Sequence, residues 1–427
     1  MPARPVSVVV VSRGRPAALA RCVAGIAQLD YAPLEVVVVA CPEGQAVVRG
    51  WPENGGIKLV PFDRPNISQA RNLGVAQAAG ELVAFIDDDA VPEPLWLRHL
   101  VSPFDRPEVA AAGGYVIGRN GISFQWTARS IDQTGEAHAL ALAGTDPAIP
   151  DPGPGRATKT EGTNMAVRRA VLARLGGFDP AFAFYLDETD LNMRIAEAGL
   201  ATAIVPLAQV HHGFAESPRR APDRTPRDLS QIAASKQVFL RKHCPASEHA
   251  EAWATFHAAQ RARLLRAMQR GPLAPDDVMR LLAGLDRGAH EGAQREIDAL
   301  PELPDPPAFQ DFGAMPGAPH EVLAGRSWQA DTLRAQAADM VGHGATVTLF
   351  LLSPTARPHR VRFTATGVWE QSGGLFGRSR RDASFFRYWR FSARIEDEMR
   401  RLVPVRGHMS YVKTGQETSC QKRHNKN

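Results

Sequence analysis

The sequence predicts an α/β fold with a mostly parallel sheet, and three observations support this class. Two runs of β-branched residues, VSVVVVS (6–12) and LEVVVVA (34–40), are continuously apolar, as are strands covered on both faces. The segment between them, PAALARCVAGIAQL, has helical spacing. A second helical pattern then precedes a third apolar run. Alternating strands and helices predict right-handed crossovers within one sheet.

The elements follow in order along the first half of the chain. The first helix begins at Pro16, because proline is tolerated in a first helical turn. The helical stretch ISQARNLGVAQAAG ends at Gly80, a typical C-cap. The apolar run 83–86 then forms a strand that ends in three aspartates. A later apolar strand, VPLAQVHHGF, ends in two histidines.

Changes in composition divide the chain into four segments. A Pro- and Gly-rich stretch, 142–162, predicts irregular structure, and alanine and arginine dominate a helical pattern from about 230 to 300. PELPDPP (301–307) separates this pattern from a region with two strand-like runs and a helix. We therefore expect an α/β domain, a helical extension, a smaller α+β region and a disordered tail, at residues 1–217, 218–305, 306–412 and 413–427.

Composition excludes several classes of protein. A hydrophobic fraction of 44% and a charged fraction of 22% are those of a globular chain, and a net charge of +5 does not require a nucleic-acid partner. The four cysteines show no paired spacing, which argues against a disulfide framework or a zinc site. No run of eighteen apolar residues occurs. We expect a cytoplasmic protein, with peripheral membrane contact at the inner face left open.

Asp87, Asp88 and Asp89 stand at the carboxyl end of a predicted strand, where α/β sheets bind ligands. Two carboxylates one residue apart can hold a hard divalent cation such as Mg²⁺ or Mn²⁺ against a diphosphate. A solvated acidic turn is the alternative for so short a motif. Arg71, on the preceding helix, is able to pair with a phosphate or with one of the acids.

A second acidic cluster lies in LDETDLNMRIAEAG. Asp187, Asp190 and Arg194 fall near one helical face, and Asp187 and Glu188 stand at the helix start, where the dipole favours carboxylates. An N-cap with a surface ion pair would give the same pattern.

Taken together and in this order, the motifs resemble those of the family 2 glycosyltransferases, which have the GT-A fold. The matching stretches are SVVVVSRGRP, ARNLG, VAFIDDDAVPEPLWL, TNMAVRR, LGGFD, LDETDLNMRIAEAG and a histidine after the last strand, within about residues 5–215. The resemblance implies a metal-dependent, inverting transfer of a sugar from a nucleotide-diphosphate donor to a sugar, lipid-linked or protein acceptor in surface polysaccharide or glycoconjugate synthesis. Homodimer formation stays open, as do two alternative functions, a sugar nucleotidyltransferase and a non-catalytic nucleotide-sugar binding protein.

The resemblance also assigns roles to residues of this chain. Glu188 stands at the position of the catalytic base, with Asp187 as the second choice. The assigned metal ligands for Mn²⁺ or Mg²⁺ are Asp87, Asp89 and His211. The residues assigned to the donor are Val11, Ser12, Arg13, Arg71, Asp87, Asp88 and Asn164.

Two positions depart from the family pattern. Cys41 follows the second strand where relatives have an aspartate, and Ser12 stands where they often have asparagine. The C-terminal half shows no resemblance. Its basic stretch GVWEQSGGLFGRSRR is compatible with an acidic acceptor, a membrane surface or a packed scaffold with a solvated basic edge.

Overall fold

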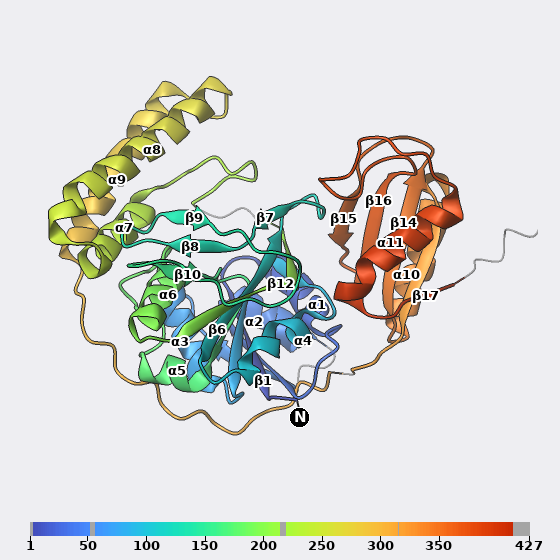
Figure 1. The fold of residues 1–427 in the computed structure, drawn as a ribbon, viewed down its shortest axis with the longest axis horizontal. Coiled ribbons are helices and arrows are strands. Elements are labelled where there is room, and N and C mark those ends of the chain that lie inside the picture. Colours follow the sequence, from blue (N-terminus) through green and yellow to red (C-terminus); the bar gives the residue numbers. More distant parts are fainter. Residues whose placement is uncertain (1–2, 52–55, 214–218, 315, 413–427) are drawn as a thin grey trace, which may run out of the picture.

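The computed structural model describes residues 3–51, 56–213, 219–314 and 316–412. The expected disordered tail, 413–427, lies outside the described residues. Figure 1 shows an α/β domain at the centre, long helices on one side of it and a smaller sheet with two helices on the other. No helix in the described ranges combines the length and the apolarity needed to cross a bilayer.

The central sheet has the strand order β3-β2-β1-β4-β11-β6-β12-β5. β1 (Val6–Ser12) pairs in parallel with β2 (Leu34–Ala40) and β4 (Leu82–Asp87), and β2 pairs in parallel with β3 (Ile57–Pro61). The carboxyl ends of these strands therefore meet at one edge of the sheet. There the loop after β1 lies beside the aspartates that follow β4.

The second half of the sheet is mixed. β11 (Met165–Arg168) runs antiparallel between β4 and β6 (Val109–Ile117). β12 (Ala201–His212) runs parallel to β6 and antiparallel to the short β5 (Ala90–Pro92), which places His212 opposite Ala90. Because β5 directly follows the three aspartates, this pairing brings the end of β12 to them. The predicted fold class is confirmed.

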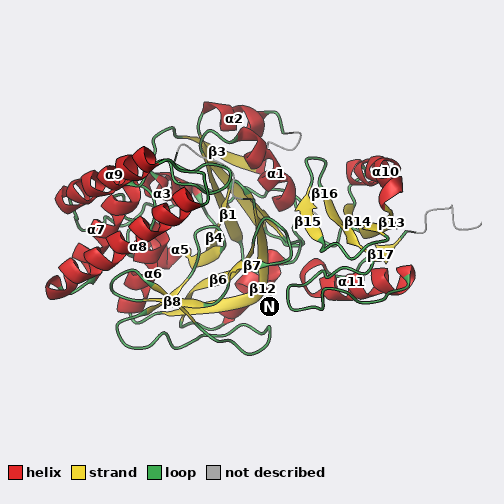
Figure 2. Ribbon diagram, turned by 90° about the horizontal axis from the view of Figure 1, so that it is seen from above, coloured by secondary structure: helices red, strands yellow, loops and turns green. Residues whose placement is uncertain are grey.

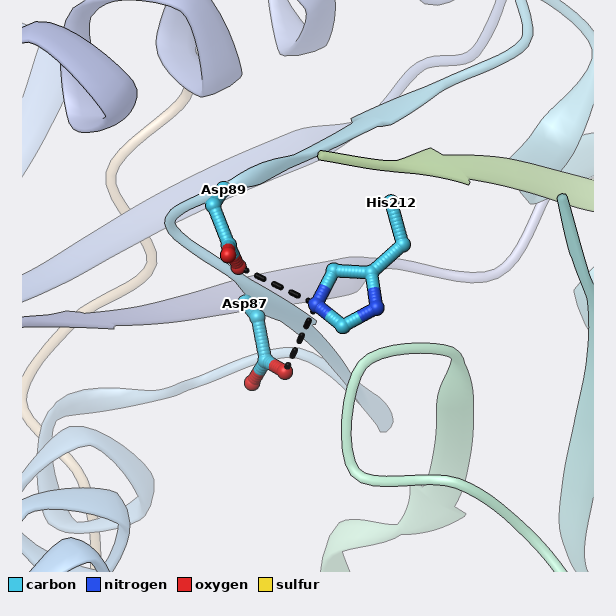
Figure 3. Close-up of side chains that lie close together, drawn as sticks. All are labelled: Asp87, Asp89 and His212. Atoms are coloured by element: carbon cyan, nitrogen blue, oxygen red, sulfur yellow. Dashed lines mark ion pairs between the residues drawn. The ribbon is translucent and has the colours of Figure 1, made fainter. Parts of the chain in front are cut away.

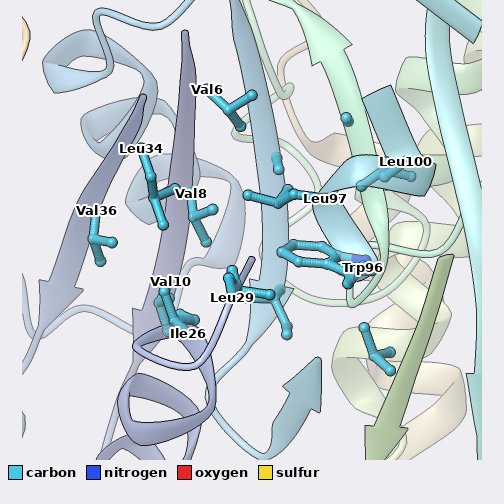
Figure 4. Close-up of a cluster of buried hydrophobic side chains, with 14 of the residues drawn as sticks. Val6, Val8, Val10, Ile26, Leu29, Leu34, Val36, Trp96, Leu97 and Leu100 are labelled. Atoms are coloured by element: carbon cyan, nitrogen blue, oxygen red, sulfur yellow. The ribbon is translucent and has the colours of Figure 1, made fainter. Parts of the chain in front are cut away.

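Alternate valines of β1 point into two different cores, which explains the continuous apolar run. Val8 and Val10 pack with Ile26, Leu97 and neighbouring residues on one face (Figure 4), and Val9 packs with Phe85 on the other. Each fully buried aliphatic side chain contributes about 1.5–3 kcal/mol. The helices of this domain are α1 (Pro16–Ile26), α2 (Pro42–Arg49), α3 (Ile67–Gln77), α4 (Trp96–Val101), α5 (Arg169–Arg174) and α6 (Asp187–Glu197).

Short strands cover the edge of this domain near the candidate site. β7 (Phe124–Trp126) pairs with β6, and a small separate sheet has the order β10-β8-β9. The segment 142–162, expected to be irregular, contains the three-residue β10. The strands of the small sheet are β8 (Arg129–Ile131), β9 (Ala137–Ala139) and β10 (Ala157–Lys159).

The helical extension consists of α7 (Ser230–His243), α8 (His249–Gln269) and α9 (Pro275–Gln294). α9 packs so closely against α7 that a Cβ atom at Gly292 would clash with the carbonyl oxygen of Ala234. α7 in turn packs beside α6, and Ser235 Oγ donates a 2.8 Å hydrogen bond to the carbonyl of Phe184 just before that helix.

After α9 the chain crosses the outside of the α/β domain to reach the C-terminal sheet (Figure 1). This linker is bonded to the domain along its way. The amide of Gln310 donates to the buried carboxylate of Glu35 at 2.8 Å, and the amide of Phe312 donates to the carbonyl of Leu34 at 2.7 Å. Phe312 is buried in the same core as Val8.

The C-terminal region is a five-stranded sheet of the order β15-β16-β14-β13-β17 in which only β15 runs antiparallel to its neighbour. Its two helices pack through separate cores on opposite faces (Figure 2). The elements are β13 (His320–Arg326), α10 (Ala330–Gly342), β14 (Thr346–Ser353), β15 (Arg360–Phe363), β16 (Val368–Gly374), α11 (Phe391–Arg406) and β17 (Ser410–Tyr411).

A buried ion pair joins this region to the α/β domain. Arg406, the last residue of α11, lies 2.7 Å from Glu93, which directly follows β5, and their side chains are 1% and 2% exposed. Burial opposes the charge of Glu93, but Arg406 and a hydrogen bond from His211 outweigh it and hold the pKa of Glu93 well below its usual range. The amide of Leu95 donates to the carbonyl of Val405 at 2.9 Å beside this pair.

We expect Arg406→Met to lower the free energy of unfolding by about 3–5 kcal/mol, because the substitution leaves the buried Glu93 carboxylate unpaired. The double variant Glu93→Gln/Arg406→Met should recover much of this loss. Urea titration of the full chain measures both. Arg400→Met, at a site on the same helix whose side chain is 77% exposed, is the matched control. A loss in the double variant as large as in the single one would contradict this account.

Candidate active site

Two carboxylates and one imidazole converge at the carboxyl edge of the central sheet (Figure 3). Asp87 ends β4, Asp89 lies in the turn before β5, and His212 ends β12. One ligand atom from each lies within 4.8 Å of the others. His212 Nε2 is 3.2 Å from Asp89 and 4.0 Å from Asp87. The three groups thus face one common point.

The imidazole of His212 is oriented as a metal ligand would be. Its Nδ1 lies 3.3 Å from the side-chain oxygen of Gln125, and its Nε2 faces Asp89. A hydrogen bond from Nδ1–H to Gln125 would give the tautomer in which Nε2 can bind a metal. Two carboxylates with one imidazole suit a divalent cation such as Mn²⁺ or Mg²⁺.

His211, the histidine assigned to the metal from the sequence, is not part of this group. Successive residues of a strand point to opposite sides, so His211 turns away from the aspartates. Its Nε2 lies 2.7 Å from Glu93, beside the interdomain ion pair, and its ring stands 5.0 Å from that of Trp369. His212, and not His211 as expected, is therefore the histidine that the structure brings to the aspartates.

Arg15 supplies positive charge to the other two aspartates. Its guanidinium lies 2.5 Å from Asp88 and 3.2 Å from Asp89. Burial raises the pKa of Asp88 to about 7, although Arg15 opposes that rise. Arg13, which the resemblance assigned to the donor, is more exposed and pairs with Asp63 at 2.9 Å. The signal for Arg15 was its place directly before the Pro16 that starts α1.

Arg71 connects the aspartates to the second acidic cluster. It is buried, its Nη1 contacts Asp187 and its Nη2 lies 3.4 Å from Asp87. The guanidinium also lies over the ring of Phe178, 5.2 Å from its centroid. Gly162 faces it so closely that a Cβ atom there would overlap the guanidinium. Of the arginines predicted for the site, Arg71 is the one that the structure brings to both acidic groups.

The acidic pair begins α6 after an unusual turn. Tyr185 and Leu186 both have positive φ, 75° and 65°, a region that bulky side chains rarely adopt. The turn ends with the Asp187 side chain 4% exposed and that of Glu188 17% exposed. Such strain concentrates at functional sites.

Lys159, which the sequence analysis did not single out, neutralises Glu188. Its Nζ lies 3.0 Å from Glu188 Oε1. Burial disfavours the charge of Glu188, yet Lys159 and Arg71 outweigh it and lower the pKa of that carboxyl. For Asp187 the balance is reversed: burial raises its pKa in spite of Arg71. The two neighbouring carboxyls therefore differ in proton affinity.

The remaining residues assigned to the donor lie at different depths. Val11 is partly buried and Ser12 buried at the end of β1, next to the loop that carries Arg15. Asn164 is fully buried. Its Nδ2 donates to the carbonyls of Tyr115 and Ala208, and its Oδ1 accepts from Trp96. The amide of Asn164 is thus used within the fold.

A family model described as glycosyltransferase like family 2 matches residues 2–229. The chain belongs to this family of glycosyltransferases. The match spans the α/β domain and reaches the residue before α7, so every residue of the candidate site lies within it.

Known proteins of this glycosyltransferase type match parts of the chain. The O-antigen biosynthesis protein RfbC of Myxococcus xanthus is 31% identical over 236 residues, 52% of this chain and 18% of that protein. A glucosyl-dolichyl phosphate glucuronosyltransferase of Haloferax volcanii is 30% identical over 181 residues, 41% of this chain and 56% of that protein. The chain spans about a fifth of the first and just over half of the second.

One solved structure to which the chain is similar is that of a mannosyltransferase of Pyrobaculum calidifontis in complex with GDP-Man and Mn²⁺. It has a TM-score of 0.42 and 19% identity, and the alignment covers 68% of this chain and 88% of that one.

We expect His212→Ala to weaken Mn²⁺ binding about tenfold or more, since even the loss of a group that only orients a ligand costs that much. His211→Ala should affect Mn²⁺ affinity far less, because its imidazole binds Glu93. Titration followed by the electron paramagnetic resonance of free Mn²⁺ gives both affinities. Each histidine variant serves as the control for the other. A greater loss of Mn²⁺ affinity in His211→Ala would show that His211 is the ligand.

Proposed function

We propose that the chain is a metal-dependent, inverting glycosyltransferase that moves a sugar from a nucleotide-diphosphate donor to an acceptor hydroxyl. The observation that carries this proposal is the meeting of two groups at one sheet edge. Asp87, Asp89 and His212 form one, the acidic pair at the start of α6 forms the other, and Arg71 links them. Family membership supplies the reaction class.

The donor diphosphate would lie against the aspartate group. Bound there, Mn²⁺ or Mg²⁺ would supply positive charge to the leaving diphosphate. Arg15 stands beside Asp88 and Asp89, so its guanidinium is close enough to take part in holding the phosphates. The buried Arg71 keeps Asp87 in place.

Glu188 is the base that we favour. The direction of the pKa shifts favours Asp187, whose proton affinity is raised, but access favours Glu188, whose side chain is the more exposed. A base must first reach the proton that it removes, so geometry decides before pKa. Asp187 is engaged with Arg71 and would act by fixing that side chain. Direct displacement with one base needs no covalent intermediate and inverts the anomeric centre.

The biological product that we propose is a surface polysaccharide or another glycoconjugate. The relatives named for O-antigen biosynthesis and for a lipid-linked sugar transfer support this choice. The name of the second relative gives a glucosyl-dolichyl phosphate as its acceptor.

A donor screen with Mn²⁺ tests the proposal, read by the release of free nucleoside diphosphate. We expect wild-type protein to release it and EDTA to abolish the release. Glu188→Gln should slow turnover on the order of 100- to 10,000-fold while donor affinity is kept, because only the proton acceptor is lost. Asp187→Asn should cost less, through misplacement of Arg71.

The outcomes of this screen separate the rival functions. With inorganic diphosphate added, conversion of the nucleotide sugar into nucleoside triphosphate and sugar 1-phosphate would indicate a sugar nucleotidyltransferase. Donor binding without any product would indicate a non-catalytic binding protein. A larger loss in Asp187→Asn would assign the base to Asp187. If neither substitution slows transfer beyond about tenfold, the acidic pair is structural.

The pH dependence of turnover tests the ion pair between Lys159 and Glu188. A base acts deprotonated, so activity falls as the pH drops through its pKa. Lys159→Met removes the charge that lowers the pKa of Glu188, and the acid limb of the kcat/KM profile should therefore move to higher pH. Lys159→Arg keeps the charge and should leave the limb near its original position. An unshifted limb in Lys159→Met would show that another group titrates.

A further inference from the structure

A cavity of about 820 Å³ lies in the C-terminal region, apart from the residues of the candidate active site. Its walls include Ser353 at the end of β14, Ser372 and Gly373 near the end of β16, and Ser327 in the short 3₁₀ turn (Ser327–Gln329) before α10. The cavity therefore opens at the carboxyl ends of parallel strands, where open α/β sheets bind their ligands. Its volume suits a small organic ligand.

Positive charge without a counterion dominates this cavity. Arg357, Arg360, Arg378 and Arg381 line it. Within the described ranges no carboxylate lies at ion-pair distance from any of the four. A fifth arginine on the wall, Arg334, shares the buried carboxylate of Glu370 with Arg362. A cleft lined by charges of one sign concentrates ions of the opposite sign.

Arg378 is held in place, but one of its hydrogen-bond donors is unpaired among the described residues. The guanidinium of Arg378 lies over the ring of Phe385, 4.2 Å from its centroid, and Nη1 donates to the carbonyl of Arg381 at 3.3 Å. Its Nε is buried and has no hydrogen-bond partner among the described residues. Leaving a buried donor unpaired is unfavourable, and an acceptor on a ligand would offset that cost.

The start of α10 adds to the positive potential of the cavity. Ala330, its first residue, lines the cavity together with Ser327. The N-terminal end of a helix carries partial positive charge and free amide groups, and it favours anions. Helix end and arginines thus point to one kind of ligand by independent routes.

We propose that this cavity is a second ligand site that binds a phosphate group, carried either by a soluble compound or by a lipid headgroup. Guanidinium groups bind phosphate oxygens in pairs, and serine hydroxyls on the wall add further donors. The site goes beyond the proposed transfer reaction, since none of its residues takes part in that reaction.

The ligand would lie between the two domains. Asn120 and Ser123 of the α/β domain form part of the wall, and the amide of Val361 donates to the carbonyl of Asn120 at 3.0 Å. Arg119, in the same loop, donates from Nε to the carbonyl of Gly213 at 3.0 Å, directly after His212. A phosphate compound in the cavity would therefore contact the loop that also touches the end of β12.

Calorimetric titration of the full chain with inorganic diphosphate in EDTA tests the site without metal-dependent binding at the aspartates. We expect Arg357→Gln/Arg360→Gln to weaken binding about tenfold or more, since two charged donors are lost. Both side chains are exposed, so the fold should be kept. Arg380→Gln is the matched control, because Arg380 lies between the cavity residues Arg378 and Arg381, pairs with Asp382 and does not itself line the cavity.

The result that overturns the proposal is either no binding by wild-type protein or an equal loss in the control and the double variant. Competition by vesicles of phosphatidylcholine with phosphatidate separates the two sources. Displacement of diphosphate by these vesicles, but not by phosphatidylcholine alone, supports the site with a lipid headgroup as its ligand. Cavity-dependent diphosphate binding that the vesicles leave unchanged supports the site with a soluble phosphate compound.

Discussion

The buried guanidinium of Arg71 is the contact on which the arrangement of the candidate site depends. It lies between Asp87, at the end of a central strand, and Asp187, at the start of α6. Without a cation here, burial and mutual repulsion would drive these carboxyls apart or to their neutral forms. The two outer acids are also paired with cations: Arg15 contacts Asp88, and Lys159 contacts Glu188. Positive and negative side chains thus alternate across the site.

The position of α6 depends on the helical extension as much as on the central sheet. Asp190, one turn into α6, is fully buried and contacts Arg194 on its own helix and Lys242 and His243 on α7. Burial opposes the charge of Asp190, but the charges of Arg194 and Lys242 and a hydrogen bond from His243 outweigh it and hold the pKa of Asp190 well below its usual range. Together with the bond from Ser235, this network fixes the turn at Tyr185 and Leu186. The helical extension, through α7, therefore helps to hold the proposed base in position.

Much of the fold could be predicted from the sequence, because strand runs and helical spacing are local signals. The three aspartates and the acidic pair were found for the same reason, since a strand end and a helix start are visible in the chain itself. The sequence does not reveal which of His211 and His212 faces the aspartates, because that depends on which face of β12 meets the turn before β5. Pairing between strands far apart in sequence decides that face.

The same limit explains the other differences. Arg13 and Arg15 are two residues apart in one loop, and only the course of that loop after β1 directs Arg15 to the aspartates. Lys159 lies in a stretch that looked irregular, and its role comes from the short β10 that carries it to Glu188. Asn164 matched a family motif, yet its amide donates to two backbone carbonyls in the interior.

The linker between α9 and the C-terminal sheet has a consequence for how the molecule can be divided. Its backbone amides complete the bonding of Glu35 and Leu34 on β2, and Phe312 fills part of the core under that strand. The α/β domain is thus a continuous stretch of sequence without being a self-sufficient unit. A fragment cut after β12 would present an open apolar groove and a buried acid lacking one of its donors. The end of the α/β domain in the sequence is therefore not the end of the smallest fragment that can fold.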